Sequence, residues 1–501
     1  MTNAILNKKL NDLKDIGFFD NLIIERGIEK EFFRIDPEGN ISEKSHPNSL
    51  GSSLTNKFIT TDFAEAQLEL VTPIFEDIDE LYDFLYSLHV FSAKNLKDEE
   101  ILWPFSMPPT IEDESAINLG YYHQSNIGLL KHVYRKGLKT RYGPTMQCVS
   151  GMHYNFSLKK ESLQKLINDT DQCAIDDAYL GLMRNFKRIF WFVLIQFGQT
   201  NVVDKSFVKG RNHTLQNLND TDLYSEFATS LRMSDIGYQS KAQQSLDIKY
   251  NSLSSFLEKI KFAITSPYPE FEVMGLKNNN GDYHQISSGI IQIENEFYDS
   301  IRPKRPSVDG VRPYEMLKKL GIEYLEIRGV DISPFDIVGI SKDQIRFLDL
   351  ILIYCLIMPS PAIAPEEKKL IDENDKKAIY KGRDENTLIV IDNKKVNIRS
   401  ATKSIIKDLK DLATFFVNSD EMTSSIISII EMEKGLLPES GFHNDSLVKA
   451  KQNMSELVSS DCKYFDIIKK ESESSLEELT KMPTNTKNEM NDFVKNYNKN
   501  L

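Results

Sequence analysis

The feature that most constrains the fold is a stretch with alternating side chains, Gly-Ile-Glu-Lys-Glu-Phe-Phe-Arg-Ile-Asp, at residues 27–36. A β-strand has a period of two, so it would place Glu29 and Glu31 next to each other on one face. Two carboxylates this close repel each other unless a cation lies between them, and Mg²⁺ prefers carboxylate oxygen. The stretch therefore predicts a metal-binding strand, although a solvated charged strand has the same local pattern.

Four further stretches predict strands with one polar face, at residues 59–73, 147–157, 290–298 and 323–330. The polar side chains that they would present include Glu65 and Glu69, with Asp62 at the strand entrance, then His153, Gln292, Glu294, Glu296 and Tyr298, and finally Glu326 and Arg328. For residues 59–73 an acidic helix would also place Glu65 and Glu69 on one face. Such alternation is typical of an antiparallel sheet with helices on one side and a wet, concave face on the other.

Basic side chains accompany these acids at Arg302, Lys304, Arg305 and Arg328. The first three form a short cluster stiffened by Pro303, which suits phosphate oxygens, although a run of charge is also typical of a solvated face. An arginine that alternates with a glutamate is expected where a metal and a transferring phosphoryl group meet. A cross-strand salt bridge is the structural alternative for Arg328.

A long polar stretch at residues 198–227 predicts a lid, a binding loop or a disordered loop. Shortly after it, Arg232 and Tyr238 could hold a carboxylate. The stretch at residues 118–143, which contains Tyr134, has a composition that suits polar ligand contacts, although a packed helix with a basic face would look similar.

Helices are predicted around the sheet, and no linker divides the chain. Apolar residues recur at helical spacing in residues 1–17, 77–97, 173–197, 251–266 and 343–358, and again in 404–417, 422–433, 447–458 and 474–481. The charges within residues 1–17 predict an amphipathic helix rather than a signal peptide. We expect an α+β fold with a single catalytic domain over residues 1–501, in which the core motifs occupy 27–358 and a helical scaffold occupies 359–501.

The net charge and the spacing of the cysteines indicate which binding partners and which cellular compartment to expect for this protein. The formal net charge of −13 argues against non-specific binding of nucleic acid, which needs a basic surface. The longest apolar runs are shorter than the roughly 20 residues that a membrane span needs. The four cysteines, Cys148, Cys173, Cys355 and Cys462, lie far apart and lack metal-type spacing, as expected for reduced thiols. We therefore expect a cytoplasmic protein that binds neither nucleic acid nor membrane.

The combination of acids and arginines favours phosphoryl transfer. Clustered carboxylates that bind two or more Mg²⁺, flanked by arginines, are what an enzyme needs to bind ATP and to stabilise transfer of its γ-phosphoryl group. The sequence contains no Gly-x-x-x-x-Gly-Lys-Ser/Thr motif, which excludes a P-loop enzyme. ATP would instead be bound mainly through metal ions held on an antiparallel sheet.

Six motifs, taken in order, resemble one family. They are Gly-Ile-Glu-Lys-Glu, Ile-Thr-Thr-Asp-Phe-Ala-Glu-Ala-Gln-Leu-Glu, Ser-Gly-Met-His-Tyr-Asn-Phe-Ser, Thr-Ser-Leu-Arg-Met-Ser-Asp-Ile-Gly-Tyr, Gln-Ile-Glu-Asn-Glu-Phe-Tyr with Ile-Arg-Pro-Lys-Arg, and Gly-Ile-Glu-Tyr-Leu-Glu-Ile-Arg. Together they resemble the proteobacterial glutamate-cysteine ligases from about Gly27 to Met358. After Met358 the resemblance is only general.

The resemblance implies a glutamine-synthetase-like fold, in which an open antiparallel sheet forms a funnel backed by helices. It also implies the first step of glutathione synthesis, the ATP-dependent joining of the γ-carboxylate of L-glutamate to the amino group of L-cysteine through γ-glutamyl phosphate. Two or three Mg²⁺ per site, or Mn²⁺ in their place, would be the cofactors. We expect a monomer.

Residue roles follow from the same resemblance. The implied metal-binding set is Glu29, Glu31, Asp62, Glu69, His153 and Glu326. Arg328 resembles the arginine at the γ-phosphate, and we expect Arg328 and Glu326 to be the catalytic residues. On its own composition, the basic cluster Arg302, Lys304 and Arg305 is predicted to bind the phosphates of ATP together with Arg328. Arg232 resembles a contact to a substrate carboxylate, and the residues that resemble the lining of a cysteine pocket are Tyr134, Tyr238 and Tyr298.

Two other interpretations fit the same acids and arginines. One is a related enzyme, such as a guanidino kinase or a ligase that joins glutamate to a different amine. The other is a non-catalytic protein that binds metal or nucleotide on the same sheet. The ligase is favoured because all six acid and histidine positions are filled.

Overall fold

The computed structural model describes residues 2–97, 99–237, 240–306, 311–435 and 438–499. Its strands are β1 Ile24–Ile35, β2 Ile59–Thr61, β3 Gln67–Val71, β4 Ile101–Leu102, β5 Met152–Leu158, β6 Val202–Asp204, β7 Gln216–Asn217, β8 Asp222–Tyr224, β9 Ile301–Lys304, β10 Tyr324–Val330, β11 Leu388–Ile391 and β12 Lys394–Asn397. Its helices are α1 Thr2–Asp15, α2 Ile78–Asn95, α3 Asn126–Tyr142, α4 Lys160–Ile167, α5 Gln172–Phe197, α6 Leu253–Thr265, α7 Pro269–Met274, α8 Pro313–Leu320, α9 Lys342–Ile357, α10 Pro365–Lys381, α11 Ile398–Ala413, α12 Ser419–Glu431, α13 Phe442–Ser459, α14 Phe465–Lys481 and α15 Lys487–Lys499.

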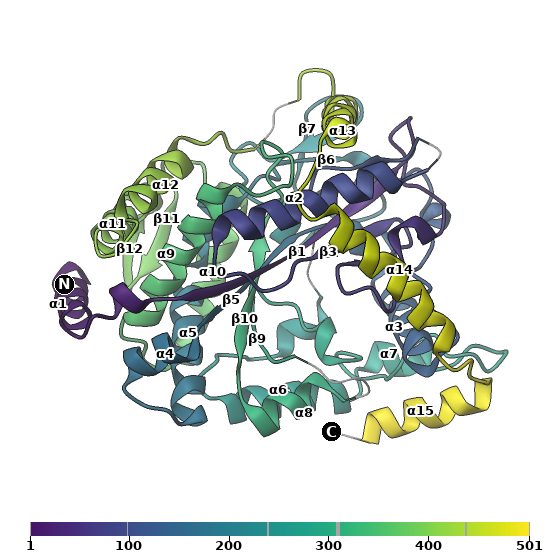
Figure 1. Ribbon diagram of the computed structural model, residues 1–501, viewed down its shortest axis with the longest axis horizontal. Coiled ribbons are helices and arrows are strands. Elements are labelled where there is room, and N and C mark those ends of the chain that lie inside the picture. The colour runs from purple at the N-terminus through teal and green to yellow at the C-terminus, as the bar shows by residue number, and fades with distance from the viewer. Residues whose placement is uncertain (1, 98, 238–239, 307–310, 436–437, 500–501) are drawn as a thin grey trace.

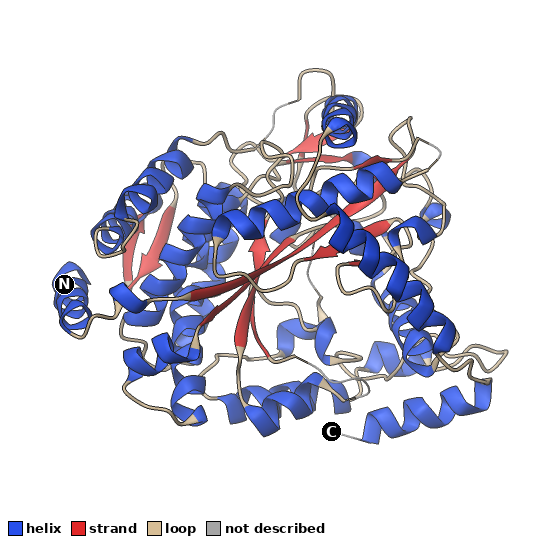
Figure 2. Ribbon diagram, in the orientation of Figure 1, coloured by secondary structure: helices blue, strands red, loops and turns tan. Residues whose placement is uncertain are grey.

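A seven-stranded antiparallel sheet organises the chain (Figure 2). Its strand order is β2-β3-β1-β5-β10-β9, and β4 pairs with the end of β1. The long central strand β1 alternates its side chains as predicted, and its pairing places Glu31 opposite Glu69 on β3 and Glu29 opposite His153 on β5. The predicted α+β class, an open antiparallel sheet backed by helices, is confirmed.

Helices cover one face of this sheet. Ile28, Tyr154 and Leu325 are fully buried in one apolar core with α5 and α9, while Phe32 packs in a second core with α2. Figure 1 shows α2 crossing β1 and β3. Because neighbouring residues of a strand point to opposite faces, burial of these apolar side chains leaves their acidic neighbours on the other face.

The C-terminal helices, which were predicted to be a scaffold, pack against other helices of the molecule. α13 and α14 pack against α2, α15 packs against α3, and α10 packs against α5. Figure 1 shows α14 and α15 in yellow along one side of the molecule, far from the N-terminus. Helix α10 and the β11–β12 hairpin were not predicted, although the turn residues Asp392 and Asn393, both with positive φ, are a typical hairpin signal.

The single strand predicted at residues 59–73 is wrong. β2 and β3 form a hairpin, and Asp62 and Glu65 lie in the turn between them. Glu65 therefore does not share a face with Glu69. Its carboxylate is buried and accepts hydrogen bonds from the backbone N–H groups of His46 and Tyr121. Asp62 lies at the entrance to β3, as expected.

The strand predicted at residues 290–298 is also wrong, since these described residues form bends and one 3-10 turn at Glu294–Glu296. The physical reason is the buried Glu296. Its carboxylate accepts the backbone N–H of Gln292 at 2.8 Å, the hydroxyl of Tyr142 at 2.7 Å and a guanidinium N–H of Arg141 at 3.0 Å. A side chain that bonds its own backbone segment competes with a strand ladder.

Two further predictions need correction. The strand predicted over residues 147–157 begins only at Met152, because Gly151 donates its N–H to the Glu31 carboxylate and residues 145–148 form a 3-10 turn. The polar stretch at residues 198–227 is not a plain loop but contains the small sheet β6-β8-β7. The proline-containing cluster 301–304 is an edge strand, a position that tolerates proline.

The described cysteines are all free thiols. Among the helices that the structure describes, none combines the length and apolar character that crossing a membrane requires.

Candidate active site

Four neighbouring strands bring acids and a histidine together on the open face of the sheet. β1 supplies Glu29 and Glu31, β3 supplies Glu69, β5 supplies His153 and β10 supplies Glu326. The His153 ring is central: Nδ1 lies 3.3 Å from Glu29 Oε2 and 3.9 Å from Glu326 Oε1, and Nε2 lies 3.4 Å from Glu31 Oε1. The predicted convergence is confirmed, and we call these five residues the acid cluster.

The acid cluster fits a divalent cation. One ligand atom from each of Glu29, Glu69 and His153 lies within 4.8 Å of the other two. Burial, together with the negative charges of Glu29, Asp62 and Glu31, raises the pKa of Glu69 well above its ordinary value. Carboxylate oxygens are the ligands that Mg²⁺ and Mn²⁺ prefer, and a cation among them, with the imidazole of His153 beside it, would remove this repulsion.

Asp62 borders the acid cluster from the β2–β3 turn. Its backbone oxygen accepts the hydroxyl of Tyr122 at 3.1 Å and a guanidinium N–H of Arg135, which fixes the turn. Its carboxylate is close enough to raise the pKa values of Glu31 and Glu69. The structure therefore brings all six predicted metal ligands to one face.

Glu326 is the point where the acid cluster meets the basic residues. Arg302 donates from Nε and contacts it from a terminal nitrogen, each at 2.8 Å, while Lys304 lies at 3.3 Å and Arg328 at 3.4 Å. Burial opposes its ionisation, but these three cations and His153 hold the pKa of Glu326 well below its ordinary value. Glu326 therefore stays ionised between the acids and the cations.

Arg305 does not join this group. Its guanidinium donates to the backbone oxygen of Gly321 at 2.6 Å and pairs with Glu323 at 2.9 Å, since alternation along the edge strand turns it away from Arg302 and Lys304. The predicted assignment of Arg305 to the phosphates of ATP therefore lacks structural support.

Arg232 lies beside the acid cluster and is held rigidly. Its Nε donates to Asp331 at 2.7 Å, and a terminal nitrogen donates to the backbone oxygens of Arg328 at 3.1 Å and Val330 at 2.8 Å. A Cβ at Gly151 would lie 2.9 Å from its other terminal nitrogen, so glycine is needed for this approach. Arg232, Arg328, Glu31 and His153 line one small cavity.

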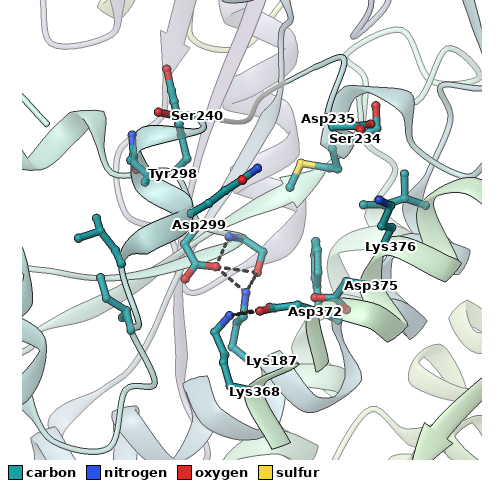
Figure 3. A pocket seen from close by; sticks show the side chains of 18 of the residues that line it. Lys187, Ser234, Asp235, Ser240, Tyr298, Asp299, Lys368, Asp372, Asp375 and Lys376 are labelled. Atoms are coloured by element: carbon teal, nitrogen blue, oxygen red, sulfur yellow. Dashed lines mark hydrogen bonds and ion pairs between the residues drawn. The ribbon is translucent and has the colours of Figure 1, made fainter. Parts of the chain in front are cut away.

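A larger, polar cavity of about 470 Å³ adjoins this small one, and the two share Met233 and Asp299. Figure 3 shows its ion pairs: Lys187 contacts Asp299 at 2.6 Å, and Lys368 contacts Asp372. A cavity lined by charges of both signs suits small zwitterions such as amino acids. We call it the polar cavity.

The three predicted pocket tyrosines differ in placement. Tyr298 lines the polar cavity, and its hydroxyl donates to the Gln147 side chain at 3.3 Å. Tyr134 on α3 instead packs between two apolar clusters. Tyr238 lies outside the described residues.

Sequence reasoning missed Lys187, Asp299, Asp331 and the α10 residues around the polar cavity. A weak signal was present, because Lys187 interrupts the apolar helix α5 and Asp331 directly follows β10. Their partners lie more than 90 residues away in the chain, so spacing alone could not pair them.

Asp375, on the α10 wall of the polar cavity, gives a pH-dependent prediction. Its Oδ1 is buried and accepts no hydrogen bond from the described residues, and burial, with Asp372 and Asp299 nearby, raises the pKa to about 8. Between pH 4 and 8 this carboxyl group therefore keeps a proton in the folded chain that it loses in the unfolded chain, so the contribution of Asp375 to stability falls as pH rises. Asp375→Asn should raise Tm by on the order of 3 °C at pH 8 and by less at pH 4.5.

The matched control for this experiment is Asp372→Asn. Asp372 is exposed and forms an i,i+4 pair with Lys368, an interaction worth little. Thermal unfolding followed by circular dichroism should show no comparable gain. A Tm gain for Asp375→Asn that does not change with pH would contradict the assigned pKa.

The open antiparallel sheet carries carboxylates beside arginines and adjoins a cavity that suits zwitterions, which fits an enzyme of the ligase class that acts on amino acids. The sequence profile of the family described as "Glutamate-cysteine ligase" matches residues 11–378. The chain belongs to this family and is a carbon-nitrogen ligase that catalyses the first step of glutathione synthesis, with glutamate and cysteine as substrates. The predicted family, fold class and activity are confirmed.

Individual relatives agree with this assignment. The chain is 43% identical to the glutamate-cysteine ligase of Hahella chejuensis over 365 residues, 72% of this chain and 69% of that protein. It is 44% identical to that of Erwinia tasmaniensis over 366 residues, 72% and 70% of the two chains.

The crystal structure of glutamate-cysteine ligase from Francisella tularensis in complex with AMP has a TM-score of 0.90 and 30% identity to this chain, and the match covers 96% of this chain and 98% of that one. A bifunctional glutathione synthetase from Pasteurella multocida shares the fold at a TM-score of 0.64 and 22% identity, covering 94% of this chain and 55% of that one. The likeness to the Francisella structure thus extends beyond Met358, where the motifs give only a general resemblance.

Proposed function

We propose that this ligase activates the γ-carboxylate of glutamate with ATP and joins the product, γ-glutamyl phosphate, to the amino group of cysteine. A carboxylate oxygen forms a bond to the γ-phosphorus and ADP leaves. The cysteine nitrogen then attacks the γ-carbonyl carbon, phosphate leaves with the electrons of the C–O bond, and the ammonium proton passes to a carboxylate or a phosphate oxygen. The observation that carries this proposal is the contact of the acid cluster with three cations through Glu326.

The proposed metal ligands are Glu29, Glu31, Asp62, Glu69, His153 and Glu326, which would hold two or three Mg²⁺, or Mn²⁺. When bound, Mg²⁺ offsets the negative charge that gathers on the transferring phosphoryl group. Asn155 orients Glu29 by donating to Oε1 at 2.9 Å, and the Gly151 N–H orients Glu31 at 2.8 Å. Supporting bonds of this kind fix the direction in which ligand oxygens point.

The basic residues are proposed to hold the phosphates of ATP. Arg328 would contact the γ-phosphoryl group, and Arg302 and Lys304 the phosphates behind it, because all three already gather at Glu326. The crystal structure of the Francisella ligase is a complex with AMP, which supports a nucleotide site in this fold. Arg305 has no part in this proposal.

Arg232 is proposed to bind a substrate carboxylate and Tyr298 to line the cysteine site. The hydrogen bond from Arg232 to Asp331 supports binding of a substrate carboxylate, because a guanidinium group that is already fixed loses little conformational entropy when the substrate binds. The position of Tyr298 on the polar cavity supports the second. Tyr134 and Tyr238 stay predictions.

We also infer a monomeric, cytoplasmic enzyme with a single catalytic domain. The single domain is supported by the helices after residue 359, which pack on those that cover the sheet.

Release of ADP and phosphate, with glutamate and a panel of amines, tests this function. Both products should appear only with Mg²⁺ and an acceptor amine, and cysteine should be strongly preferred. Analogues that differ by one methylene should react about 10- to 200-fold more slowly, because apolar size discrimination is limited to that range. ADP formed with a phosphorylated amine and no phosphate would identify a kinase instead.

A further inference from the structure

The small cavity beside the acid cluster and the polar cavity meet at two shared residues, Met233 and Asp299. Residues of the acid cluster line the small cavity together with Arg232 and Arg328. An amine bound in the polar cavity therefore reaches the acid cluster past Met233 and Asp299. The charged side chains at this junction are placed to decide which acceptor amine is correctly oriented.

Asp299 is fixed at the junction by three hydrogen bonds. Its Oδ1 accepts the ammonium of Lys187 and the backbone N–H of Ser300, each at 2.6 Å, and its Oδ2 accepts the hydroxyl of Tyr250 at 2.6 Å. Burial opposes its ionisation, but the charge of Lys187 and the hydrogen bonds from Lys187 and Tyr250 hold the pKa of Asp299 below its ordinary value. Because both of its oxygens are already engaged, Asp299 serves to hold Lys187 in place.

Lys187 keeps hydrogen-bonding capacity toward the polar cavity. An ammonium group has three N–H donors. Among the residues that the structure describes, Asp299 and the hydroxyl of Ser300, at 3.3 Å, accept two of them. Lys187 lines the polar cavity, and Figure 3 shows its tip between Asp299 and the α10 acids Asp372 and Asp375. One N–H therefore remains for a group bound in the cavity.

The charges around Lys187 favour an anion as that group. Burial opposes its charge, but Asp299, Asp375 and Asp372 raise the pKa of Lys187, so it stays positive at neutral pH. Asp372 is already paired with Lys368, and Asp299 with Lys187 itself. The pKa of Asp375, raised by burial to about 8, keeps that carboxyl mostly protonated at neutral pH. A carboxylate beside Lys187 would therefore meet little uncompensated negative charge.

We propose that Lys187 binds the α-carboxylate of the acceptor amino acid, whose amino group then points past Asp299 and Met233 to the acid cluster. The proposal rests on the acceptor site proposed above and adds a residue to it. Lys187 is then a specificity-determining residue, because it gives a charge-assisted hydrogen bond to an α-amino acid and none to an amine without a carboxylate. Arg232 remains for a carboxylate of glutamate.

Two acceptors that differ only in the carboxylate test this assignment. Cysteamine has the thiol and the amine of cysteine but no carboxylate, so the ratio of kcat/KM for cysteine to kcat/KM for cysteamine measures carboxylate recognition. Lys187→Met should lower this ratio by about 10- to 100-fold, the size expected for one charge-assisted hydrogen bond. Initial rates of phosphate release give both values. A partial loss of folded enzyme lowers both rates equally and leaves the ratio unchanged.

A second variant and a control guard against an indirect effect. Lys187→Met leaves the buried charge of Asp299 unpaired, so the neutral pair Lys187→Met/Asp299→Asn is measured as well and should lower the ratio similarly. The matched control is Arg188→Met at the next position of α5. Arg188 pairs with Glu367 at 2.6 Å, away from both cavities, so this variant should keep the wild-type ratio.

Binding of 3-mercaptopropionate separates this proposal from the ligase mechanism. This compound has the thiol and the carboxylate but no amine, so it binds without turnover. Calorimetry should show that its dissociation constant rises about 10- to 100-fold in the neutral-pair variant, whereas that of cysteamine does not. Equal losses of kcat/KM for cysteine and cysteamine, or unchanged binding of 3-mercaptopropionate, would overturn the proposal. If the wild-type enzyme ligates neither amine, the proposed function fails, and this binding experiment still decides the role of Lys187.

Discussion

Glu326→Gln should lower kcat by on the order of a thousandfold while the enzyme stays folded. The neutral amide keeps the shape of the side chain but removes the charge that holds Arg302, Lys304 and Arg328 in place and one oxygen ligand of the proposed metal site. Initial rates of ADP release at saturating substrates give kcat, and circular dichroism checks the fold. Glu29→Gln should have a similar effect, because it removes a proposed ligand beside His153.

The matched control is Glu323→Gln, three residues earlier in the chain. Glu323 is half exposed and pairs with Arg305 outside the acid cluster, so kcat should not change. Normal turnover in both Glu326→Gln and Glu29→Gln would refute the metal assignment.

Arg328→Lys should lower kcat by on the order of a hundredfold, because a lysine cannot supply two donors in a fixed plane to the transferring phosphoryl group. Affinity for glutamate should change little, since Arg232 is held by Asp331 independently of the Arg328 side chain. Steady-state kinetics with each substrate varied in turn separate the two effects. Arg305→Lys, which alters an arginine that faces Glu323, serves as the control.

This second variant also separates the ligase from a protein that only binds nucleotide. In a non-catalytic protein, loss of Arg328 would leave ATP affinity and biological role nearly intact. If Arg328→Lys lowers kcat, changes ATP affinity little and abolishes biological activity, the result supports the ligase over a protein that only binds nucleotide.

Sequence patterns predicted the acid face well because a strand has a fixed period. Once residues 27–36 are a strand, Glu29 and Glu31 must share a face, and burial of Ile28 and Phe32 decides which face it is. The same reasoning correctly placed His153 and Glu326. The register between strands, which sets Glu29 opposite His153, depends on pairing across more than 120 residues and could not be inferred from the sequence.

The failures have local causes. At residues 290–298, Gln292 and Glu296 form hydrogen bonds within an irregular segment. Their alternating positions in the sequence are the same as those of polar residues on one face of a strand, so the pattern alone could not distinguish the two structures. At residues 59–73 the turn holding Glu65 has no glycine or proline to mark it. Arg305 follows Lys304 by one position, so the strand period itself excludes it from the face of Lys304.

The order of the strands also bears on how a newly made chain assembles. β5 pairs with β10, whose partner residues lie about 170 positions later, so synthesis leaves one long edge of the sheet open until residues 324–330 have left the ribosome. Until then the carboxylates of β1 and β3 lack the neighbouring basic side chains of β9 and β10. The unpaired edge of β5 can also pair with other nascent chains. Pairings this distant also slow folding, which lengthens the time for which that edge is exposed.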